Sequence, residues 1–587
     1  NTKAVVDATN AYAGLIENES LTRIEGYKDI IRQIMGDGDG AQQMQSTALL
    51  MQLGSALMSG KSLDPGLKGF MDIVGQAGMQ VAPTLFQMGV EKGKAEREIG
   101  AAALNMYMSE LDKMQDRSGP FTVVYENLYK TAEGYKPYTV KTKTIQIKEA
   151  VDTTFKVKVS NHGPIMNGII SHMNDTRPVA MHWLYTQLDN KQLDVSYEMS
   201  HATSLHRFKN AVAKIHAPGL NVMYGDAKGN IAWFASAKLY QLRDSLSSKL
   251  YLDGASGTDE ITEFLPFSEN PQAINPSWNY VYSANNQPDS VRGKLYPGYY
   301  QPQDRAKRIV SLLEGKDDFT KQDIEEMIYD VQSATVSNIA KDLLENVRRT
   351  DLSASQKKAI SILERWNGDY QKNAIPPTLY NRFLYEVLVA TYKDELGGSF
   401  PLFINSQLQD QAFPIQVKRE KSIWWDNVTT ENKTETRNEI ITNSFLSAYA
   451  FLENQLGENV DNWMWKRVIS LEHEHAIGKA GGLLRKFFNV GPFETIGGNE
   501  VINNQIFKLD STGIYKITAG PSTRRVIDFS DIENSSAILP TGQSGRVFSP
   551  YYKDQAQKFI DGEFVKMSLN EADIKQSENV LVLKPKQ

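Results

Sequence analysis

Histidine is the residue type in this chain that first raises the question of metal chemistry. The eight histidines are His162, His172, His182, His201, His206, His216, His473 and His475. His473 and His475 are two residues apart, so on a β-strand both side chains would point to the same face, as zinc ligands can. No third ligand follows at a diagnostic spacing. We therefore interpret both as surface histidines or hydrogen-bonded core histidines rather than as a metal pair.

The common nucleophile and phosphate motifs do not occur in this sequence. The chain has no cysteine, which excludes disulfides, thiolate metal sites and a cysteine nucleophile. The Gly-x-Ser-x-Gly pattern of a nucleophile elbow does not occur, and Gly542-Gln543-Ser544-Gly545 is too short for it. Glycine patterns that cradle phosphates also fail to appear between a strand and a helix. The net charge of −6 argues against a nucleic-acid partner. No apolar run reaches the roughly 18 residues that a membrane-spanning helix needs.

The acidic run Asp37-Gly38-Asp39-Gly40 has some of the character of a calcium-binding loop. An EF-hand requires a glutamate at the twelfth position of the loop, and counting from Asp37 that position is Ala48. The run is therefore predicted to be a polar turn between two helices.

The composition changes near residue 130. Ten of the 18 methionines lie in the first 114 residues, whereas all eight tryptophans lie at or after Trp183. Apolar residues recur at helical spacing in the first part, which predicts a Met-rich helical segment of unknown role over residues 1–131. A methionine stripe at this spacing usually forms adaptable core or a partner surface.

Beyond residue 120 the apolar period becomes that of β-strands. Alternation around Ile145 and again around Val157 predicts an antiparallel hairpin with one buried face, and residues 222–234 predict a second hairpin. Residues 303–400 read as mainly helical, with Thr320 and Asp323 spaced as a capping box. Short strands with Gly-rich turns return after residue 467. Strands, then helices, then strands indicate an α+β fold.

Several motifs, in order along the chain, resemble the penicillin acylase family of N-terminal-nucleophile hydrolases. They are His162-Gly163-Pro164, Tyr224-Gly225-Asp226 with Gly229-Asn230-Ile231, Leu265-Pro266-Phe267, Asn275-Pro276, Ser283-Ala284-Asn285-Asn286-Gln287-Pro288, Asp304-Arg305-Ala306, Trp465 to Gly478, Gly520-Pro521-Ser522, Gly542-Gln543-Ser544-Gly545, and Ser549-Pro550 with Tyr552, Asp554 and Gln555. Each motif alone is weak, but together they span about three quarters of the chain. Residues 132–587 are similar to the larger (beta) subunit, whereas residues 1–131 are not.

The resemblance implies a fold and a reaction. The fold would be the four-layer αββα arrangement, incomplete here, with residues 303–400 as a mainly helical arm. Members of the family are secreted or periplasmic precursors that cut themselves at a Gly-Ser bond. The new N-terminal serine attacks an acyl amide, its own α-amine acts as the base through a water, and an acyl-enzyme forms. An α-amine with an ordinary pKa near 8 suits that task at neutral pH.

The family's remaining catalytic groups map onto two positions of this chain. The first asparagine of the family's Asn-Asn pair supplies an oxyanion donor, which implies that role for Asn285. Arg305 matches the arginine that supports it. We expect Asn285 at the end of a strand with its amide pointing into a cleft, and Arg305 within roughly 3–6 Å. The alternative is that Asn285 only caps a strand-end turn.

The chain departs from the family where the nucleophile should lie. The serine segment should precede Tyr135, but Met-rich sequence stands there, and the side chain of Asn1 is not nucleophilic. The chain as given is therefore expected to be inactive. His475-Ala476-Ile477-Gly478 replaces His-Pro-Leu-Gly, and Ile469 replaces a histidine, which affects substrate contacts rather than the fold.

The resemblance also implies the partners. They are a small-molecule acyl amide or acyl-homoserine lactone and the smaller acylase subunit, with no nucleic acid and no membrane. A structural calcium belongs to the family, although most of its ligands would lie in the replaced segment. No other cofactor is implied. The competing hypothesis is a non-enzymatic fusion or pseudoenzyme, in which a helical assembly module is joined to an acylase scaffold.

Overall fold

The computed structural model describes residues 127–170, 177–189, 191–243, 246, 250–577 and 581–585. Residues 1–126 of the Met-rich segment, which include the Asp37 turn and Asn1, lie outside these residues. Residues 128–131, at the end of the segment predicted to be helical, form a strand and not a helix. Within the described part, strands come first, helices follow and short strands return, so the predicted α+β order is present. No helix of this part combines the length and the apolarity that crossing a bilayer requires.

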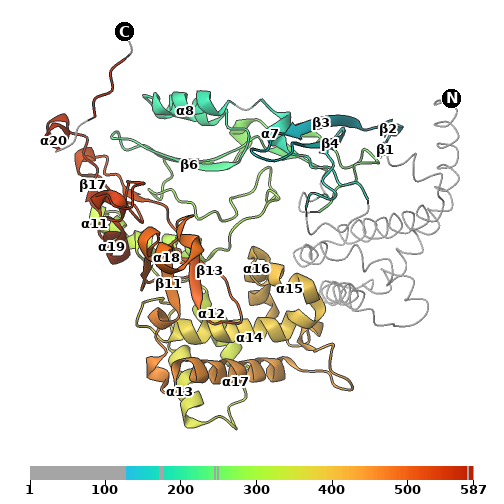
Figure 1. Cartoon of the computed structure of the whole chain (residues 1–587), viewed down its shortest axis with the longest axis vertical. Coiled ribbons are helices and arrows are strands. Elements are labelled where there is room, and N and C mark those ends of the chain that lie inside the picture. Colours follow the sequence, from blue (N-terminus) through green and yellow to red (C-terminus); the bar gives the residue numbers. More distant parts are fainter. Residues whose placement is uncertain are drawn as a thin grey trace.

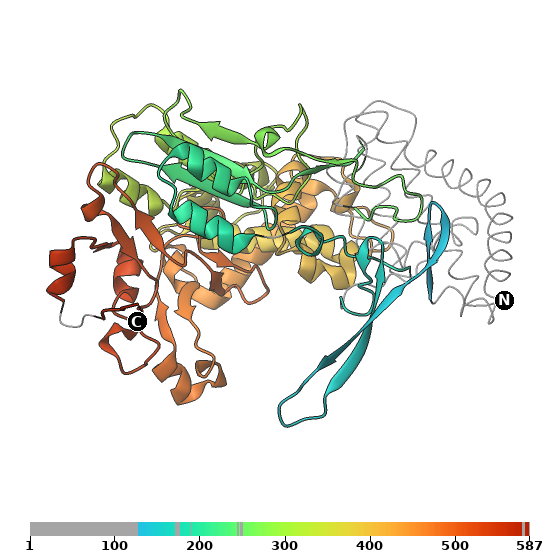
Figure 2. The ribbon, with the colours of Figure 1, turned by 90° about the horizontal axis from the view of Figure 1, so that it is seen from above.

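The first described strands form a projecting arm. They are β1 (Leu128–Thr131), β2 (Gly134–Pro137), β3 (Thr139–Ile145), β4 (Thr153–Ser160) and β5 (Gly163–Pro164). β3 and β4 pair antiparallel from Thr139↔Val159 to Ile145↔Thr153 and extend away from the body (Figure 2). The predicted hairpin is thus confirmed, but its predicted buried face is wrong, because every residue of β3 is exposed.

The reason lies in the register of the arm. Directly opposed residues of an antiparallel pair share a face. Lys141 and Lys143 oppose apolar residues on one face, while Lys156 and Lys158 lie on the other. Each face therefore mixes lysines with apolar residues, and neither is apolar enough to favour burial.

A three-stranded antiparallel sheet follows, in the order β10-β7-β6. Its strands are β6 (Leu220–Gly225), β7 (Ile231–Ser236) and β10 (Gln272–Ile274), and the second predicted hairpin is β6–β7. Alternate residues of β7, Ala232 and Phe234, are fully buried against Val195 and Val212. These come from α8 (Gln192–Ser200) and α9 (Leu205–Val212), the helices that cover this sheet face (Figure 2).

Most of the apolar core lies in the helical part. The helices are α10 (Asp304–Leu313), α11 (Lys321–Ile328), α12 (Val336–Leu344), α13 (Ala354–Glu364), α14 (Pro376–Leu396), α15 (Phe400–Phe403), α16 (Gln407–Gln416) and α17 (Arg437–Leu456). The long helices α14 and α17 lie side by side (Figure 1), with Phe383 and Phe445 in edge-to-face contact at 5.5 Å between ring centroids. The helices thus continue past residue 400 to Leu456. The predicted capping box of α11, Thr320 with Asp323, is confirmed.

The C-terminal strands form two small sheets. One has the order β12-β11-β14-β13, with β11 (Ile469–His473), β12 (Val490–Phe493), β13 (Ile506–Phe507) and β14 (Tyr515–Ala519). β11 and β14 pair in parallel, whereas β11 and β12 pair antiparallel. The other sheet joins β15 (Arg524–Val526), β16 (Ser536–Ile538) and β17 (Val565–Lys566). The short elements α7 (Leu184–Gln187), β8 (Tyr240–Gln241), β9 (Glu263–Phe264), α18 (Gly482–Phe488), α19 (Ala556–Asp561) and α20 (Glu571–Lys575) complete the described chain.

Contacts between residues far apart in sequence fix α11 against this C-terminal region. Arg524 of β15 is buried between the rings of Tyr329 and Phe559, which lie 4.3 and 3.7 Å from its guanidinium carbon. The Tyr329 hydroxyl donates to the Phe559 carbonyl, and Arg524 Nη1 donates to the same carbonyl at 2.9 Å. Burial lowers the pKa of Arg524 to about 10, against the opposing effect of Tyr329. The residue that follows α11 is therefore held by chain segments about 195 and 230 positions later.

Candidate active site

The loop between β10 and α10 carries Asn285. Its backbone has a φ of 61°, in the left-handed region that asparagine tolerates better than most residues. The Asn285 carbonyl accepts from the Gln301 N–H at 2.9 Å, and the Asn285 N–H donates to Ser283 Oγ at 3.2 Å. The predicted place at a strand end is wrong, because β10 already ends at Ile274. Asn285 is also exposed rather than turned away from solvent.

Arg305 lies in the first turn of α10 and contacts Asn285. Its Nη2 donates to Asn285 Oδ1 at 3.3 Å and to the Ala284 carbonyl at 2.8 Å. The predicted proximity of the two side chains is confirmed, while their catalytic role stays a prediction. The neighbouring residue Asp304 fixes the start of the helix, since its carboxylate accepts from Ser333 Oγ at 3.1 Å and from the Thr335 hydroxyl. Burial raises the pKa of Asp304, and these two hydroxyls oppose the rise.

A third residue, Glu500, joins this pair and was not anticipated from the sequence. Its Oε2 lies 3.6 Å from Arg305 Nε, and both side chains are less than one fifth exposed. Glu500 has a φ of 54°, an uncommon value for a residue that is not glycine. Burial raises the pKa of Glu500, while the charge of Arg305 opposes the rise. The two residues are 195 positions apart, and no spacing in the sequence connects them.

The residues just before Glu500 are held by contacts with Phe507 and Tyr370. The Asn499 side chain accepts from the Phe507 N–H at 3.0 Å and donates to the Phe507 carbonyl at 3.3 Å. At Gly498 a Cβ would stand 2.8 Å from the Tyr370 ring, so only glycine fits without a shift. These contacts leave Glu500 in place beside the Arg305 guanidinium.

The geometry sets the orientation of the Asn285 amide. Because the guanidinium binds Oδ1, the N–H₂ group is turned away from Arg305. Asn285 Nδ2 donates to no residue that the structure describes. A fixed amide N–H₂ with free donor capacity can stabilise negative charge that develops on a carbonyl oxygen.

His473 and His475 are not arranged as a pair of metal ligands. β11 ends at His473, so strand alternation does not extend to His475. Burial lowers the pKa of His473, and the His475 ring stacks on Phe488 with centroids 5.1 Å apart. Residues 127–585, as far as the structure describes them, include no cluster of His, Asp or Glu that could hold a metal ion. The carboxylates of these residues therefore offer no clustered ligand set for a calcium ion.

The architecture matches that of a known acylase. A solved structure of thermostable penicillin G acylase from Alcaligenes faecalis superimposes with a TM-score of 0.54 at 18% sequence identity, covering 78% of this chain and 84% of that one. At this level of identity the match defines the fold, which is that of the N-terminal-nucleophile hydrolases.

The sequence then defines the family. Residues 100–576 match the penicillin amidase family, and the chain belongs to that family. The match begins at residue 100, so the predicted boundary at residue 132 is too late, and residues 100–131 also match the family. Acyl-homoserine lactone acylase QuiP of Pseudomonas aeruginosa is 23% identical over 506 residues, which cover 78% of this chain and 57% of QuiP. Penicillin acylase 2 proenzyme of Pseudomonas sp. strain SE83 is 22% identical over 445 residues, which cover 74% of this chain and 54% of the proenzyme. This chain thus spans little more than half the length of these relatives.

Proposed function

We propose that this chain supplies the oxyanion-stabilising part of an acyl-amide hydrolase. The observation that carries the proposal is the Asn285–Arg305–Glu500 arrangement, in which a partly buried ion pair fixes the amide of an exposed asparagine. Family membership supports the same reaction class.

In the proposed reaction, an N-terminal serine hydroxyl attacks the carbonyl carbon of the acyl amide. The serine proton passes, through a water, to the α-amine and then to the leaving nitrogen as the C–N bond breaks. Asn285 Nδ2 donates to the oxyanion of the tetrahedral intermediate, and Arg305 keeps Oδ1 occupied throughout. Water then hydrolyses the acyl-serine ester and releases a carboxylic acid.

The substrate class is drawn from the relatives. The names of two matched proteins refer to acyl-homoserine lactones and penicillin, which both contain an acylated amine. We accordingly propose a small acylated amine as substrate.

We further propose that the chain with the given sequence does not turn over by itself, because we recognise no counterpart of the family's nucleophilic serine before Tyr135. The test is hydrolysis of a chromogenic phenylacetyl anilide and of an N-acyl-homoserine lactone by the purified chain, for which we expect no release of product. Hydrolysis that a single internal Ser→Ala or Thr→Ala substitution abolishes would show that the chain carries its own nucleophile.

A complementary test supplies the nucleophile. Residues 132–587 are joined downstream of the serine-bearing segment of the Pseudomonas aeruginosa relative and produced together with that protein's remaining polypeptide. Amide hydrolysis by this restored enzyme is the expected result. A folded assembly that binds substrate without hydrolysing it would favour the non-enzymatic alternative.

A further inference from the structure

Helix α18 and the loop 545–549 form an apolar surface, called here the α18 face. None of the seven residues of α18 is buried, and Leu483 and Phe487 are 72% and 57% exposed. Phe548, from the neighbouring loop, is 91% exposed. An aromatic ring with this exposure has almost no packing contact in the folded chain, so its apolar surface is free to be covered by something else.

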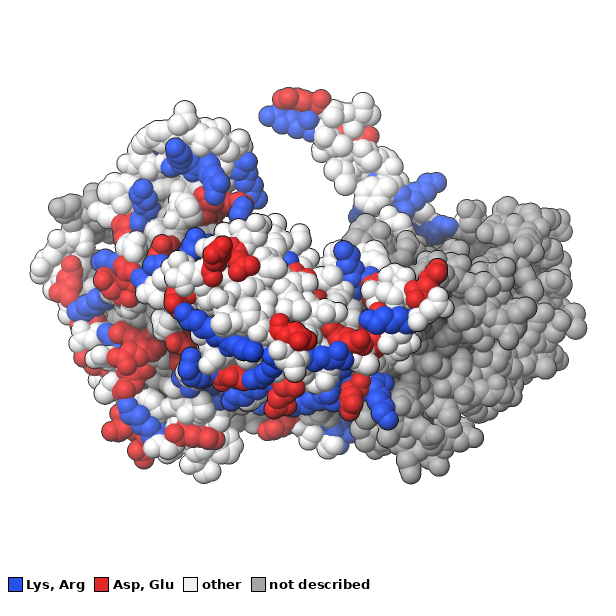
Figure 3. Space-filling model, turned by 90° about the horizontal axis from the view of Figure 1, so that it is seen from below, with Lys and Arg blue, Asp and Glu red and all other residues white. Residues whose placement is uncertain are grey.

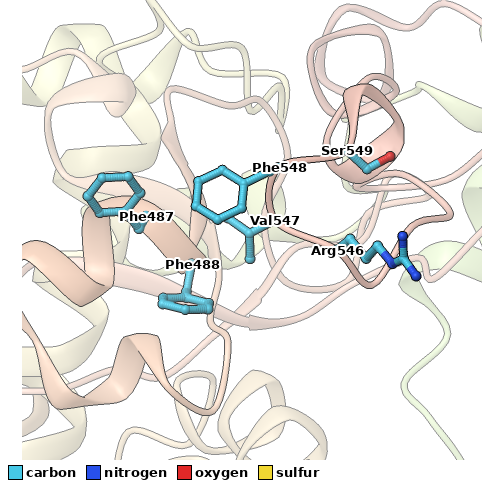
Figure 4. A pocket seen from close by; sticks show the side chains of 6 residues that line it. All are labelled: Phe487, Phe488, Arg546, Val547, Phe548 and Ser549. Carbon is cyan, nitrogen blue, oxygen red and sulfur yellow. The ribbon is translucent and has the colours of Figure 1, made fainter.

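The α18 face contains a pocket. The pocket has a volume of about 770 Å³ and is lined by Phe487, Phe488, Arg546, Val547, Phe548 and Ser549. In Figure 4 the three phenylalanine rings lie toward one end of the pocket, while the Arg546 side chain and Ser549 lie toward the other. The pocket therefore has an apolar end and a polar, cationic end.

Cations surround this apolar surface although the chain as a whole is acidic. Residues 472–488 and 545–549 contain four cations and two carboxylates, in a chain of net charge −6. Arg485 neutralises Glu472 at 2.7 Å. Lys479, Lys486 and Arg546 form no ion pair with any residue in the described part of the chain. The other carboxylate, Glu474, is exposed.

We propose that the α18 face binds the surface of an anionic phospholipid bilayer. Phe548, Phe487 and Leu483 would enter the boundary between headgroups and acyl chains, where protruding phenylalanine and leucine side chains are favoured. Lys486 and Arg546 would lie among the lipid phosphates. One acyl chain would occupy the apolar end of the pocket between the phenylalanine rings, and the phosphate of the same lipid would lie near Arg546.

The positive charge of the α18 face favours an anionic lipid bilayer over a second copy of this chain. A second copy bound through the same face would bring the unpaired cations Lys479, Lys486 and Arg546 of the two copies toward one another, whereas a bilayer with anionic lipids presents phosphate and hydrocarbon together. This contact is peripheral and differs from membrane spanning, which the helices of the described residues do not support.

The test is co-flotation of the full chain with vesicles of phosphatidylglycerol and phosphatidylcholine, compared with phosphatidylcholine alone. We expect recovery with the anionic vesicles only, and we expect added NaCl to reduce it by screening. Lys486→Glu with Arg546→Glu should weaken binding at least about tenfold, since each basic residue near such a surface contributes about 1 kcal/mol. Phe487→Ser with Phe548→Ser should weaken it to a similar degree.

Matched variants control for general effects. Lys357→Glu with Lys393→Glu changes the net charge equally at exposed lysines of α13 and α14, and Leu193→Ser removes an exposed leucine of α8, which is 86% exposed. Both should bind anionic vesicles like the parent chain. All substituted side chains are exposed, and the half-buried Phe488 is left unchanged, so folding should persist.

Three outcomes would overturn the proposal. One is no recovery with anionic vesicles, and another is equal loss of binding in the α18-face variants and the controls. The third is a dimer in solution, measured by light scattering, that Phe487→Ser with Phe548→Ser converts to a monomer while vesicle recovery stays the same. That last result would assign the face to a second copy.

Discussion

Asn285 presents the two ends of its amide to different surroundings. The oxygen is held by Arg305 at 3.3 Å, and the N–H₂ group stays available. Arg305 is in turn held by Glu500 and by the Ala284 carbonyl. The rotamer is thus selected before any substrate arrives, which is the condition under which an oxyanion donor is most effective.

In the restored enzyme, Asn285→Ala should lower kcat by about 10²–10³ with little change in KM, because the lost hydrogen bond strengthens in the transition state. The measurement is steady-state hydrolysis of the phenylacetyl anilide. The matched control is Asn279→Ala, an exposed asparagine of the same loop with the same φ of 61°. Equal losses in both variants would mean that the loop conformation, rather than the amide of Asn285, carries the effect.

The contact between Asn285 and Arg305 could be predicted from the sequence. The contact of Arg305 with Glu500 and the exposure of Asn285 could not. Family motifs placed both residues, and the 19 intervening residues leave enough chain to bring them together. Glu500 comes from a distant loop and occupies a strained backbone conformation, which depends on tertiary contacts that no local pattern records. The exposure of Asn285 likewise depends on what the surrounding chain covers.

Among the secondary-structure elements, α14 contains a buried acidic residue whose ionisation opposes folding. Glu395 is 3% exposed. Burial raises its pKa to about 10, with further contributions from the hydrogen bond and charge of Asp394 and from the charge of Asp426. In the unfolded chain a glutamate ionises near 4.3. Unfolding therefore releases a proton above that pH, and stability should fall as the pH rises toward about 10.

Glu395→Gln removes this ionisation and keeps the shape of the side chain. We expect the free energy of unfolding of the variant to exceed that of the parent by about 1–3 kcal/mol near pH 8, and to be similar near pH 5. Urea unfolding at both pH values measures the difference, with the exposed Glu420→Gln on the chain segment after α16 as control. A difference that does not change with pH would place the cause in packing instead.

Helices were easier to predict than the burial of strands. The Thr320–Asp323 capping box is a local pattern, and the side chain of each residue reaches a backbone N–H within the same helical turn. The hairpin of β3 and β4 also follows from local alternation. The exposure of this hairpin does not follow from the sequence. Alternation with period two shows that the two faces of a strand differ, but it does not show whether another layer of the protein covers either face.

At the scale of the whole molecule, the β3–β4 arm is separate from the main body (Figure 2). The turn at its tip makes its hydrogen bonds within itself, from the Ile147 N–H to Asp152 Oδ1 and from the Ala150 N–H to the Ile147 carbonyl. On the face shown in Figure 3, Lys and Arg mix with Asp and Glu over the body, and the arm stands clear of it. A two-stranded ribbon of this kind contributes little to global stability.

Replacing residues 146–152 with Asn-Gly should therefore leave the thermal midpoint within about 2 °C of the parent value. The two residues form a type I′ turn that closes on the Ile145↔Thr153 pair and preserves the register. As a contrast, Asp226→Ala in the β6–β7 turn removes the acceptor for the Lys228 and Asn230 N–H groups and should lower the midpoint. A large drop on shortening the arm would reveal a packing partner for its tip.

The contact of Tyr329 with Phe559 has a consequence for synthesis on the ribosome. The two residues are 230 positions apart, and translation at about 5–20 residues per second needs roughly 10–50 s to cover that distance. For this time α11 has emerged, but the segments that hold it through Arg524 and Phe559 have not. The apolar side of the nascent helix is then open to chaperones and to misdirected contacts, so the synthesis of β15 and α19 determines when this half of the chain becomes native.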